Sequence, residues 1–406
     1  MTKLKPWLQK SLIVALIFSG LVFGLAITEI GLRIAGFEYT KFQTVDSSRG
    51  WTDKPGFAAW YRIEGGSYIE INSEGFRDRE HTKIKPENTL RIAMVGDSIV
   101  SAYEVSAEEN MANLIEQKLN EELKLGETKV EVIKFGTAGY GTDQELITLR
   151  EKVWDYSPDI VILVFYPYND VMNNSRLINS KVYDINNTKP YFIYEDGHLV
   201  LDNSYVNTSN YQANTSWVSK GWEQIRDRSR LLQFVSKVKF YPSFGQQLAT
   251  LWLPIDGNLE PTIYDEVYKE QTDSQQWQQA WQVTDELIKL MHSEVKAKGA
   301  DFLVVTVGDG VQTYPDSSVR QKFIQRLGVA DLSYPDRRIQ ALGDRYGFKV
   351  INLAPIFQDY AQENKVCLQG FDNFVHCRGH LNVLGHQLAS KVITQELSQE
   401  IHTDSI

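Results

Sequence analysis

Hydrophobic residues gather in five short runs along the later part of the chain, and segments with helical spacing lie between them. Each run is apolar throughout, which is typical of strands buried on both faces of a parallel sheet. The runs are Arg91–Val95, Val130–Phe135, Asp159–Phe165, Phe302–Val307 and Lys349–Leu353. Strands that alternate with helices predict a doubly wound α/β fold with right-handed crossovers and a five-stranded, mostly parallel sheet.

The clearest helical pattern follows the first run. Ser106-Ala107-Glu108-Glu109 has the spacing of a capping box, which predicts that a helix begins there. Apolar residues then recur at helical intervals as far as Leu123.

The interval from about 172 to 300 interrupts this alternation. It contains Tyr191–Leu201, with Asp196-Gly197 as a hairpin signal, and a later Trp-rich helical stretch that includes Trp277 and Trp281. We expect an insertion that forms a cap or substrate wall, or a peripheral elaboration with no contact to substrate.

The N-terminal segment predicts a membrane anchor. Ser11–Thr28 carries no charge and is just long enough to cross a hydrocarbon core, and Lys3, Lys5 and Lys10 precede it. Lysine on that side predicts a cytoplasmic N-terminus and an extracytoplasmic main domain, in the periplasm or on the cell surface. A cleaved signal peptide is the alternative.

These patterns divide the chain into three parts. Residues 1–34 are the cytoplasmic tip and anchor, 35–88 a strand-rich lead-in, and 89–406 the main domain with its insertion. Gly65-Gly66 marks a turn within the lead-in, before a segment that alternates like a strand.

Composition narrows the class of partner. The 406 residues carry a formal net charge of −10, which argues against nucleic acid. The two cysteines, Cys367 and Cys377, cannot form a zinc site alone. They are either unrelated buried thiols or, since the compartment is expected to be oxidising, a local disulfide.

Small or polar residues follow the first three predicted strands. These are Gly96-Asp97-Ser98, the glycine-rich segment Phe135–Thr142 and Tyr166-Pro167-Tyr168-Asn169-Asp170. Strand ends are where open α/β sheets bind ligands. A Ser on a tight turn can act as a nucleophile. Backbone N–H groups in a glycine loop and an Asn amide can donate hydrogen bonds to an oxyanion. Each segment alone is equally typical of caps and turns.

His380 is the candidate base. It precedes a helix-like run and could reach the same edge of the sheet. His386 lies six residues later, a spacing that does not share one helical face, so we predict no metal site. The alternative is that His380 is a structural histidine on the surface without a catalytic role.

In this order, these residues resemble the SGNH (GDSL) hydrolases. The resemblance is carried by Gly96-Asp97-Ser98, Gly139 in FGTAGYGT, Asn169 in YPYND and His380 in HLNxxGH, within residues 88 to 395. It implies a three-layer flavodoxin-like fold and a serine esterase without a cofactor. Ser98 would be the nucleophile and His380 its base, and the oxyanion hole would be formed by Ser98, Gly139 and Asn169.

Two positions depart from the family pattern. Pro167 stands where the family has Gly, and Cys377 stands where the family has the carboxylate that orients the histidine. Either Asp372 or another carboxylate then orients His380, or the site is a Ser–His dyad.

We therefore expect hydrolysis of an acyl ester, with an O-acetyl group on a surface or exported polysaccharide as one candidate substrate. An acyltransferase that passes the acyl group to a sugar is the first alternative. The second is a glycan-binding protein on a fold that has lost catalysis, which the Cys at position 377 suggests.

Overall fold

The computed structural model describes residues 5–39, 41–122, 128–183, 188–240, 259 and 261–403. The chain forms two compact units. One comprises Met1–Lys41 with Ala213–Thr250, and the other Phe42–Gln212 with Leu251–Ile406. The insertion expected at 172–300 therefore contributes residues to both units.

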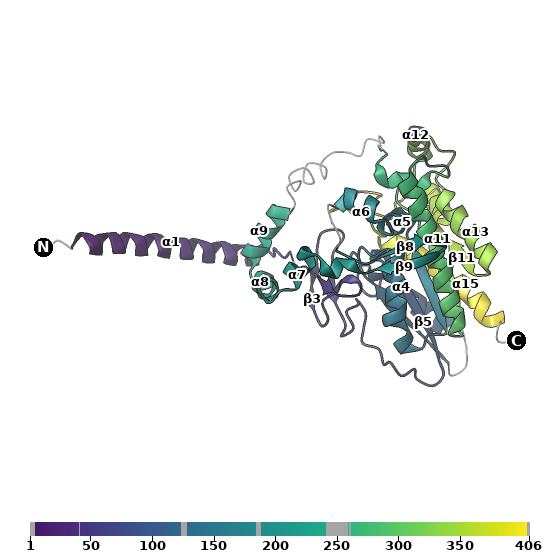
Figure 1. Cartoon of the computed structure of the whole chain (residues 1–406), viewed down its shortest axis with the longest axis horizontal. Coiled ribbons are helices and arrows are strands. Elements are labelled where there is room, and N and C mark those ends of the chain that lie inside the picture. Colours follow the sequence, from purple (N-terminus) through teal and green to yellow (C-terminus); the bar gives the residue numbers. More distant parts are fainter. Residues whose placement is uncertain are drawn as a thin grey trace. The chain divides into compact units, whose positions relative to one another are not determined.

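A five-stranded sheet forms the centre of the larger unit (Figure 1). Every strand pair in it is parallel, and the strand order is β11-β10-β7-β5-β6. This is the flavodoxin-like order. β6 lies on one side of β5, and β7, β10 and β11 follow one another on the other side. The strands are β5 (Thr89–Gly96), β6 (Lys129–Gly136), β7 (Ile160–Phe165), β10 (Asp301–Thr306) and β11 (Lys349–Asn352). All five strands predicted from the apolar runs are confirmed.

Helices cover both faces of this sheet because its side chains alternate between two cores. On β5, Ile92 and Met94 belong to one core, while Ala93 and Val95 belong to the other. The first core is closed by α3 (Met111–Glu122), α14 (Leu353–Asn364) and α15 (Val383–Thr403). The second is closed by α4 (Thr142–Glu151), α11 (Gln275–Ala297), α12 (Ser317–Leu327) and α13 (Tyr334–Tyr346). The result is the predicted three-layer α/β fold.

The helix expected from Ser106 begins later than predicted. Ser106 and Glu109 do bond to each other, Oγ to Oε2 at 2.9 Å, but the segment is a turn and α3 begins at Met111. Asn110 accepts a hydrogen bond from the Ala112 N–H at 2.8 Å and so caps the helix in place of Ser106.

Short two-stranded sheets surround the core. The lead-in forms β1 (Gln43–Asp46) with β2 (Gly50–Asp53), and β3 (Ala58–Tyr61) with β4 (Ser67–Glu70). The hairpin predicted around Asp196-Gly197 is confirmed as β8 (Tyr191–Glu195) and β9 (His198–Asp202), and both turn residues have positive φ.

The remaining short elements of the larger unit are α2 (Ser98–Ser101), η1 (Val153–Tyr156), α5 (Pro167–Asn173), α6 (Arg176–Tyr183), η2 (Ser204–Asn207) and η3 (Ile263–Tyr268). Helix α7 (Ser209–Thr215) joins the two units along the chain.

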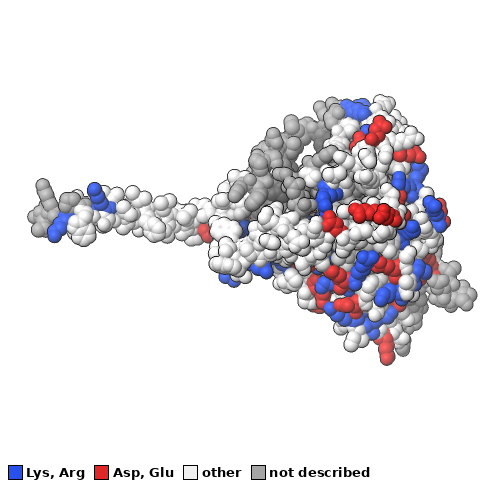
Figure 2. Space-filling model, viewed as in Figure 1, with Lys and Arg blue, Asp and Glu red and all other residues white. Residues whose placement is uncertain are grey.

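In the smaller unit, the described residues before Lys41 and after α7 form one long helix and two short ones. Helix α1 (Pro6–Ile34) is long and apolar enough to cross a membrane, and in Figure 2 it is white over most of its length. Helices α8 (Trp217–Arg228) and α9 (Arg230–Phe240) lie at its C-terminal end (Figure 1).

Candidate active site

Ser98 lies on a sharp turn between β5 and α2. Asp97 caps α2, since its Oδ1 accepts the Ile99 N–H at 2.9 Å. Gly96 and Gly136 pair across the strand ends, and a Cβ at either would lie 2.6 Å from the Val100 side chain. The two glycines therefore let α2 lie directly on the sheet edge, where it presents the Ser98 hydroxyl.

The carboxylate of Asp97 connects three of the predicted site residues. Its Oδ2 lies 3.4 Å from Ser98 Oγ and accepts a hydrogen bond from Asn169 Nδ2 at 2.8 Å. Burial raises the pKa of Asp97, while these hydrogen bonds and the charge of His380 oppose the rise. Ser98, Asn169 and His380 therefore share one electrostatic environment.

Asn169 lies in the first turn of α5, directly after β7. Pro167, the departure from the family pattern, is in this first turn, where proline has the φ that a helix needs and no N–H is required. The Asn169 amide carries two N–H groups, and one of them binds Asp97. The second is a donor that an oxyanion could use.

Gly139 follows β6 and has a φ of 83°, a conformation that favours glycine. The carbonyl before it, on Ala138, accepts hydrogen bonds from Gln43 Nε2 at 2.7 Å and Trp51 Nε1 at 3.1 Å. Because a trans peptide is planar, fixing this carbonyl also fixes the Gly139 N–H, which points the opposite way. Lead-in residues thus orient a predicted oxyanion donor.

His380 is held by a carboxylate from the lead-in. Glu64, in the loop between β3 and β4, receives the His380 backbone N–H on Oε1 at 2.9 Å and faces Nδ1 with Oε2 at 2.6 Å. The Glu64 side chain is 3% exposed. At Gly379, where φ is 95°, a Cβ would lie 2.4 Å from Glu64 Oε1. Glycine before the histidine is what lets the two groups meet.

A second acid adjoins this pair. Glu104 Oε1 lies 3.3 Å from His380 Nδ1. Burial raises the pKa of Glu104 to about 7 against the opposing charge of His380. Burial disfavours the charged form of His380, but Glu104, Glu64 and Asp97 outweigh it and raise the pKa of His380 to about 10. The ring is therefore strongly basic, with Nδ1 occupied and Nε2 left for a substrate or nucleophile.

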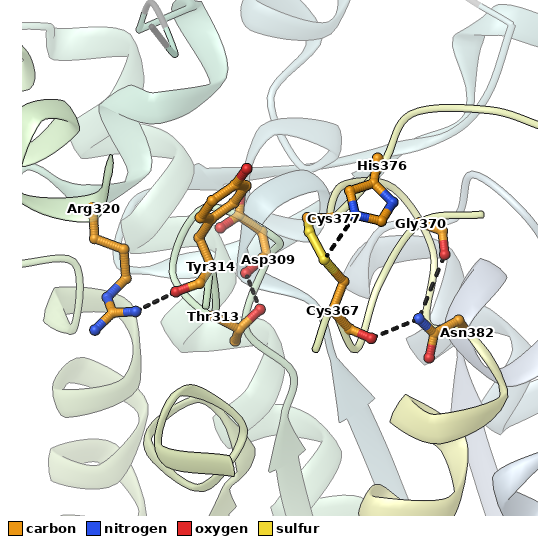
Figure 3. The surroundings of a disulfide bond; sticks show 9 residues. All are labelled: Asp309, Thr313, Tyr314, Arg320, Cys367, Gly370, His376, Cys377 and Asn382. Carbon is orange, nitrogen blue, oxygen red and sulfur yellow. Dashed lines mark hydrogen bonds between the residues drawn. A yellow bond between two sulfur atoms is a disulfide. The ribbon is translucent and has the colours of Figure 1, made fainter. Parts of the chain in front are cut away.

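The loop that carries His380 is cross-linked. Cys367 and Cys377 are joined by a disulfide, and the Asn382 amide donates to the Cys367 carbonyl at 2.8 Å (Figure 3). The Gly370 N–H donates to the His380 carbonyl at 2.9 Å. These contacts restrain the backbone on both sides of His380 in addition to the bond from Glu64.

Asp372 does not hold the position predicted for it. It is exposed on this loop, and the carboxylates that face His380 among the described residues are Glu64 and Glu104. Cys377, at the usual position of the family's acid, is committed to the disulfide. The carboxylate that is hydrogen-bonded to His380 therefore comes from the lead-in, 316 residues away along the chain.

His386 has a structural environment. It is buried, its Nδ1 accepts the Met111 N–H at 3.3 Å, and burial lowers its pKa to about 3. His386 therefore anchors the start of α3 as a neutral ring.

Glu64, Glu104 and His380 bring three potential metal-ligating atoms within 4.8 Å of one another. Two of these residues, Glu64 and His380, are already joined by a hydrogen bond. The absence of a metal stays a prediction, which a chelator can test.

Glu64, Glu104, Gln43 and Trp51 were missed by sequence reasoning. The one local signal was Gly65-Gly66, which directly follows Glu64 and does form the predicted turn, since β3 and β4 pair across it. A double glycine beside an acid was a hint that backbone comes close to another part of the chain. A Cβ on Gly65 would indeed lie 2.3 Å from the Glu104 carbonyl oxygen.

No family model and no curated protein matches the sequence. Solved structures that match include the acetyl xylan esterase AlAXEase, at 13% identity and a TM-score of 0.38, covering 75% of this chain and 98% of that one. A lipase/acylhydrolase from Enterococcus faecalis matches at 15% identity and a TM-score of 0.36, covering 76% and 96%. The acetylxylan esterase Axe2 from Geobacillus stearothermophilus, as its S15A mutant, matches at 10% and 0.37, covering 78% and 96%.

The chain resembles the SGNH hydrolases in the order of its motifs and in its strand order.

Proposed function

We propose that this protein is a membrane-anchored serine esterase that hydrolyses acyl esters outside the cytoplasm. Ser98 is the nucleophile, His380 the base, and Glu64 the carboxylate that orients the base. The Ser98 N–H, the Gly139 N–H and the Asn169 amide form the oxyanion hole. The observation that carries the proposal is the hydrogen bond between Glu64 Oε2 and His380 Nδ1 at 2.6 Å. Asp97, whose charge acts on the same histidine, contacts both Ser98 and Asn169.

The chemistry follows from these roles. Ser98 Oγ attacks the ester carbonyl while His380 Nε2 takes its proton, and the carbonyl oxygen becomes an anion held by the three donors. Collapse expels the alcohol, which receives the proton from Nε2. Water, activated by the same nitrogen, then attacks the acyl-serine and releases the acid. Glu64 stabilises the imidazolium formed in each half of the reaction.

The buried acid pair weakens the case for a protein that has lost catalysis. That alternative rested on Cys377 at the position of the usual acid, and Glu64 supplies a carboxylate to the same ring. A buried carboxylate that orients a histidine beside Ser98 and Asn169 is the arrangement that a serine nucleophile and its base require.

Anchoring and location are part of the proposal. Helix α1 presents its apolar side chains to the surroundings along its length, and lysines precede the apolar run. We infer a single span with the N-terminus in the cytoplasm. An O-acetylated polysaccharide is the candidate substrate that this location favours.

Hydrolysis of p-nitrophenyl acetate by the purified full chain tests the activity. The wild-type protein should release p-nitrophenol with EDTA present, and Ser98→Ala should abolish the release. Equal rates in the two proteins would refute the assignment, and loss of wild-type activity in EDTA would point to a metal at Glu64, Glu104 and His380. A polysaccharide acceptor that gains acetyl mass would identify acyl transfer instead.

A further inference from the structure

The short helices at the end of α1 expose apolar side chains. On α8, Trp217 is 84% exposed, Ile225 57% and Trp222 54%, and Val218 is also exposed. At 100° per residue these four side chains fall within an arc of about 140°. Glu223, Arg226 and Asp227 lie outside this arc and are less exposed, whereas Arg228, the last residue of the helix, lies within it. A helix in water has the opposite arrangement.

Helix α9 continues the pattern. Phe234, Val235 and Val238 are exposed and occupy one stripe of the helix. Together with the four residues of α8 they are called the apolar face below. Seven exposed large apolar side chains on two adjoining helices form a patch that calls for a partner.

Helix α1 holds the end of α8 and the start of α9 in place. Glu29 Oε1 and Oε2 accept the Arg230 and Leu231 N–H groups, at 3.0 and 2.8 Å, so one residue of α1 caps α9. Arg33 donates to the Arg228 carbonyl, the end of α8, at 2.7 Å. Residues one turn apart on α1 therefore hold the end of one short helix and the start of the other.

The length of the apolar run then places the pair relative to a bilayer. Ser11–Thr28 extends about 27 Å as a helix, close to the ~30 Å of the hydrocarbon core. Glu29 follows this run directly, so its carboxylate lies at the boundary between hydrocarbon and headgroups. Because α9 begins within hydrogen-bond distance of that carboxylate, both short helices start in the headgroup layer.

Composition fits the same layer. Tryptophan is enriched where apolar and polar regions of a membrane meet. Residues 217–240 contain six Lys or Arg and two acidic residues, in a chain whose net charge is −10. A cationic segment complements the phosphates of lipid headgroups.

We propose that α8 and α9 lie in the membrane interface, with the apolar face inserted among the lipids on the side of the bilayer where α1 ends. The inference rests on the proposed anchoring by α1 and adds a second membrane contact. The protein then binds the bilayer through a span and two interfacial helices, and its partner at this surface is lipid.

Spin labels in the full chain test the orientation. The two native cysteines are paired in the disulfide, so single cysteines can be introduced as Ile225→Cys and Val235→Cys on the apolar face. Lys220→Cys is the matched control, because Lys220 is also exposed but lies outside the arc. Val22→Cys reports on the span. The protein is reconstituted in liposomes of phosphatidylcholine and phosphatidylglycerol.

For each spin label, the rate of collision with oxygen, which concentrates in lipid, is divided by the rate of collision with a water-soluble nickel complex. We expect the ratio to shift toward oxygen at positions 225 and 235 and toward nickel at position 220. Equal, water-like ratios at 225 and 220 would overturn the inference, as would labels at 225 and 235 shielded from both reagents, which would mean that protein covers the face. A lipid-like value at position 22 in either case leaves the anchor standing, whereas a water-like value there contradicts the anchor itself.

Discussion

The carboxyl edge of the sheet and the lead-in hairpin contribute to the site in different ways. The sheet edge supplies Ser98 and Asn169, each within a few residues of a strand end, and strand pairing fixes their spacing. The hairpin supplies Glu64, which reaches His380 only because Gly65 and Gly379 allow close approach of backbone. In the proposed mechanism the edge presents the groups that bond to substrate, and the hairpin carboxylate orients the base.

The largest effect that tests this comparison is expected at Glu64. Glu64→Gln keeps the shape of the side chain but removes the charge that stabilises the imidazolium, so kcat should fall on the order of 10⁴-fold. Asp372→Asn is the matched control and should retain wild-type kcat, since Asp372 is exposed and faces away from these contacts. The reverse result would restore Asp372 as the orienting acid and leave the hairpin without a catalytic role.

A smaller loss is expected on the side of the sheet edge. Asn169→Ala removes one oxyanion donor and should lower kcat by about 10²–10³-fold with little change in KM. Steady-state kinetics with p-nitrophenyl acetate measure it. Since the Asn169 amide also binds Asp97, circular dichroism and the melting temperature must match the wild type for the loss to count. An unchanged kcat would exclude Asn169 from the oxyanion hole.

The site residues at the edge of the sheet could be predicted because they lie close in the sequence to the apolar runs that form the strands. The apolar runs predicted the five strands; Gly96 ends β5, and Ser98 and Asn169 lie within four residues of a strand end. The carboxylate could not be found this way. Glu64 and His380 are 316 positions apart, and no periodicity links a hairpin turn to a loop before the last helix. The predicted helix start at Ser106 was wrong because Asn110 caps the helix instead, and α3 begins at Met111.

A third substitution tests how the hairpin is held. The Asn373 side chain donates to the Gly65 carbonyl at 2.6 Å and accepts the Gly65 N–H at 2.9 Å, beside Glu64. Asn373→Ala removes both bonds. If this destabilises the packing of the hairpin on the His380 loop by about 1.4 kcal/mol, kcat/KM should drop roughly tenfold. Asp372→Ala, one residue away, serves as the control. A drop of equal size in both variants would mean that the loop is merely sensitive to change.

The smallest effect on rate, and the most specific, is expected at Glu104. Only unprotonated His380 can accept the Ser98 proton, and its pKa is raised, so kcat/KM should rise with pH through a limb well above the usual 6.5. Glu104→Gln removes the strongest of the charges that raise that pKa, so the limb should move to lower pH. The plateau at high pH should change by less than about tenfold, because Glu104 contacts no reacting atom. A limb that stays in place would show that Glu104 does not tune the base.

The reactivity of Ser98 toward a fluorophosphonate tests the central claim most directly, because the reagent needs only a serine activated by an oriented base. Labelling rates are measured in the full chain, and the adduct is mapped by peptide mass spectrometry. We predict labelling at Ser98 in the wild type, the same rate in Asp372→Asn, and a rate lower by orders of magnitude in Glu64→Gln. An adduct at another residue, or equal rates in Glu64→Gln and the wild type, would contradict a nucleophile on the sheet edge whose base is oriented by the lead-in.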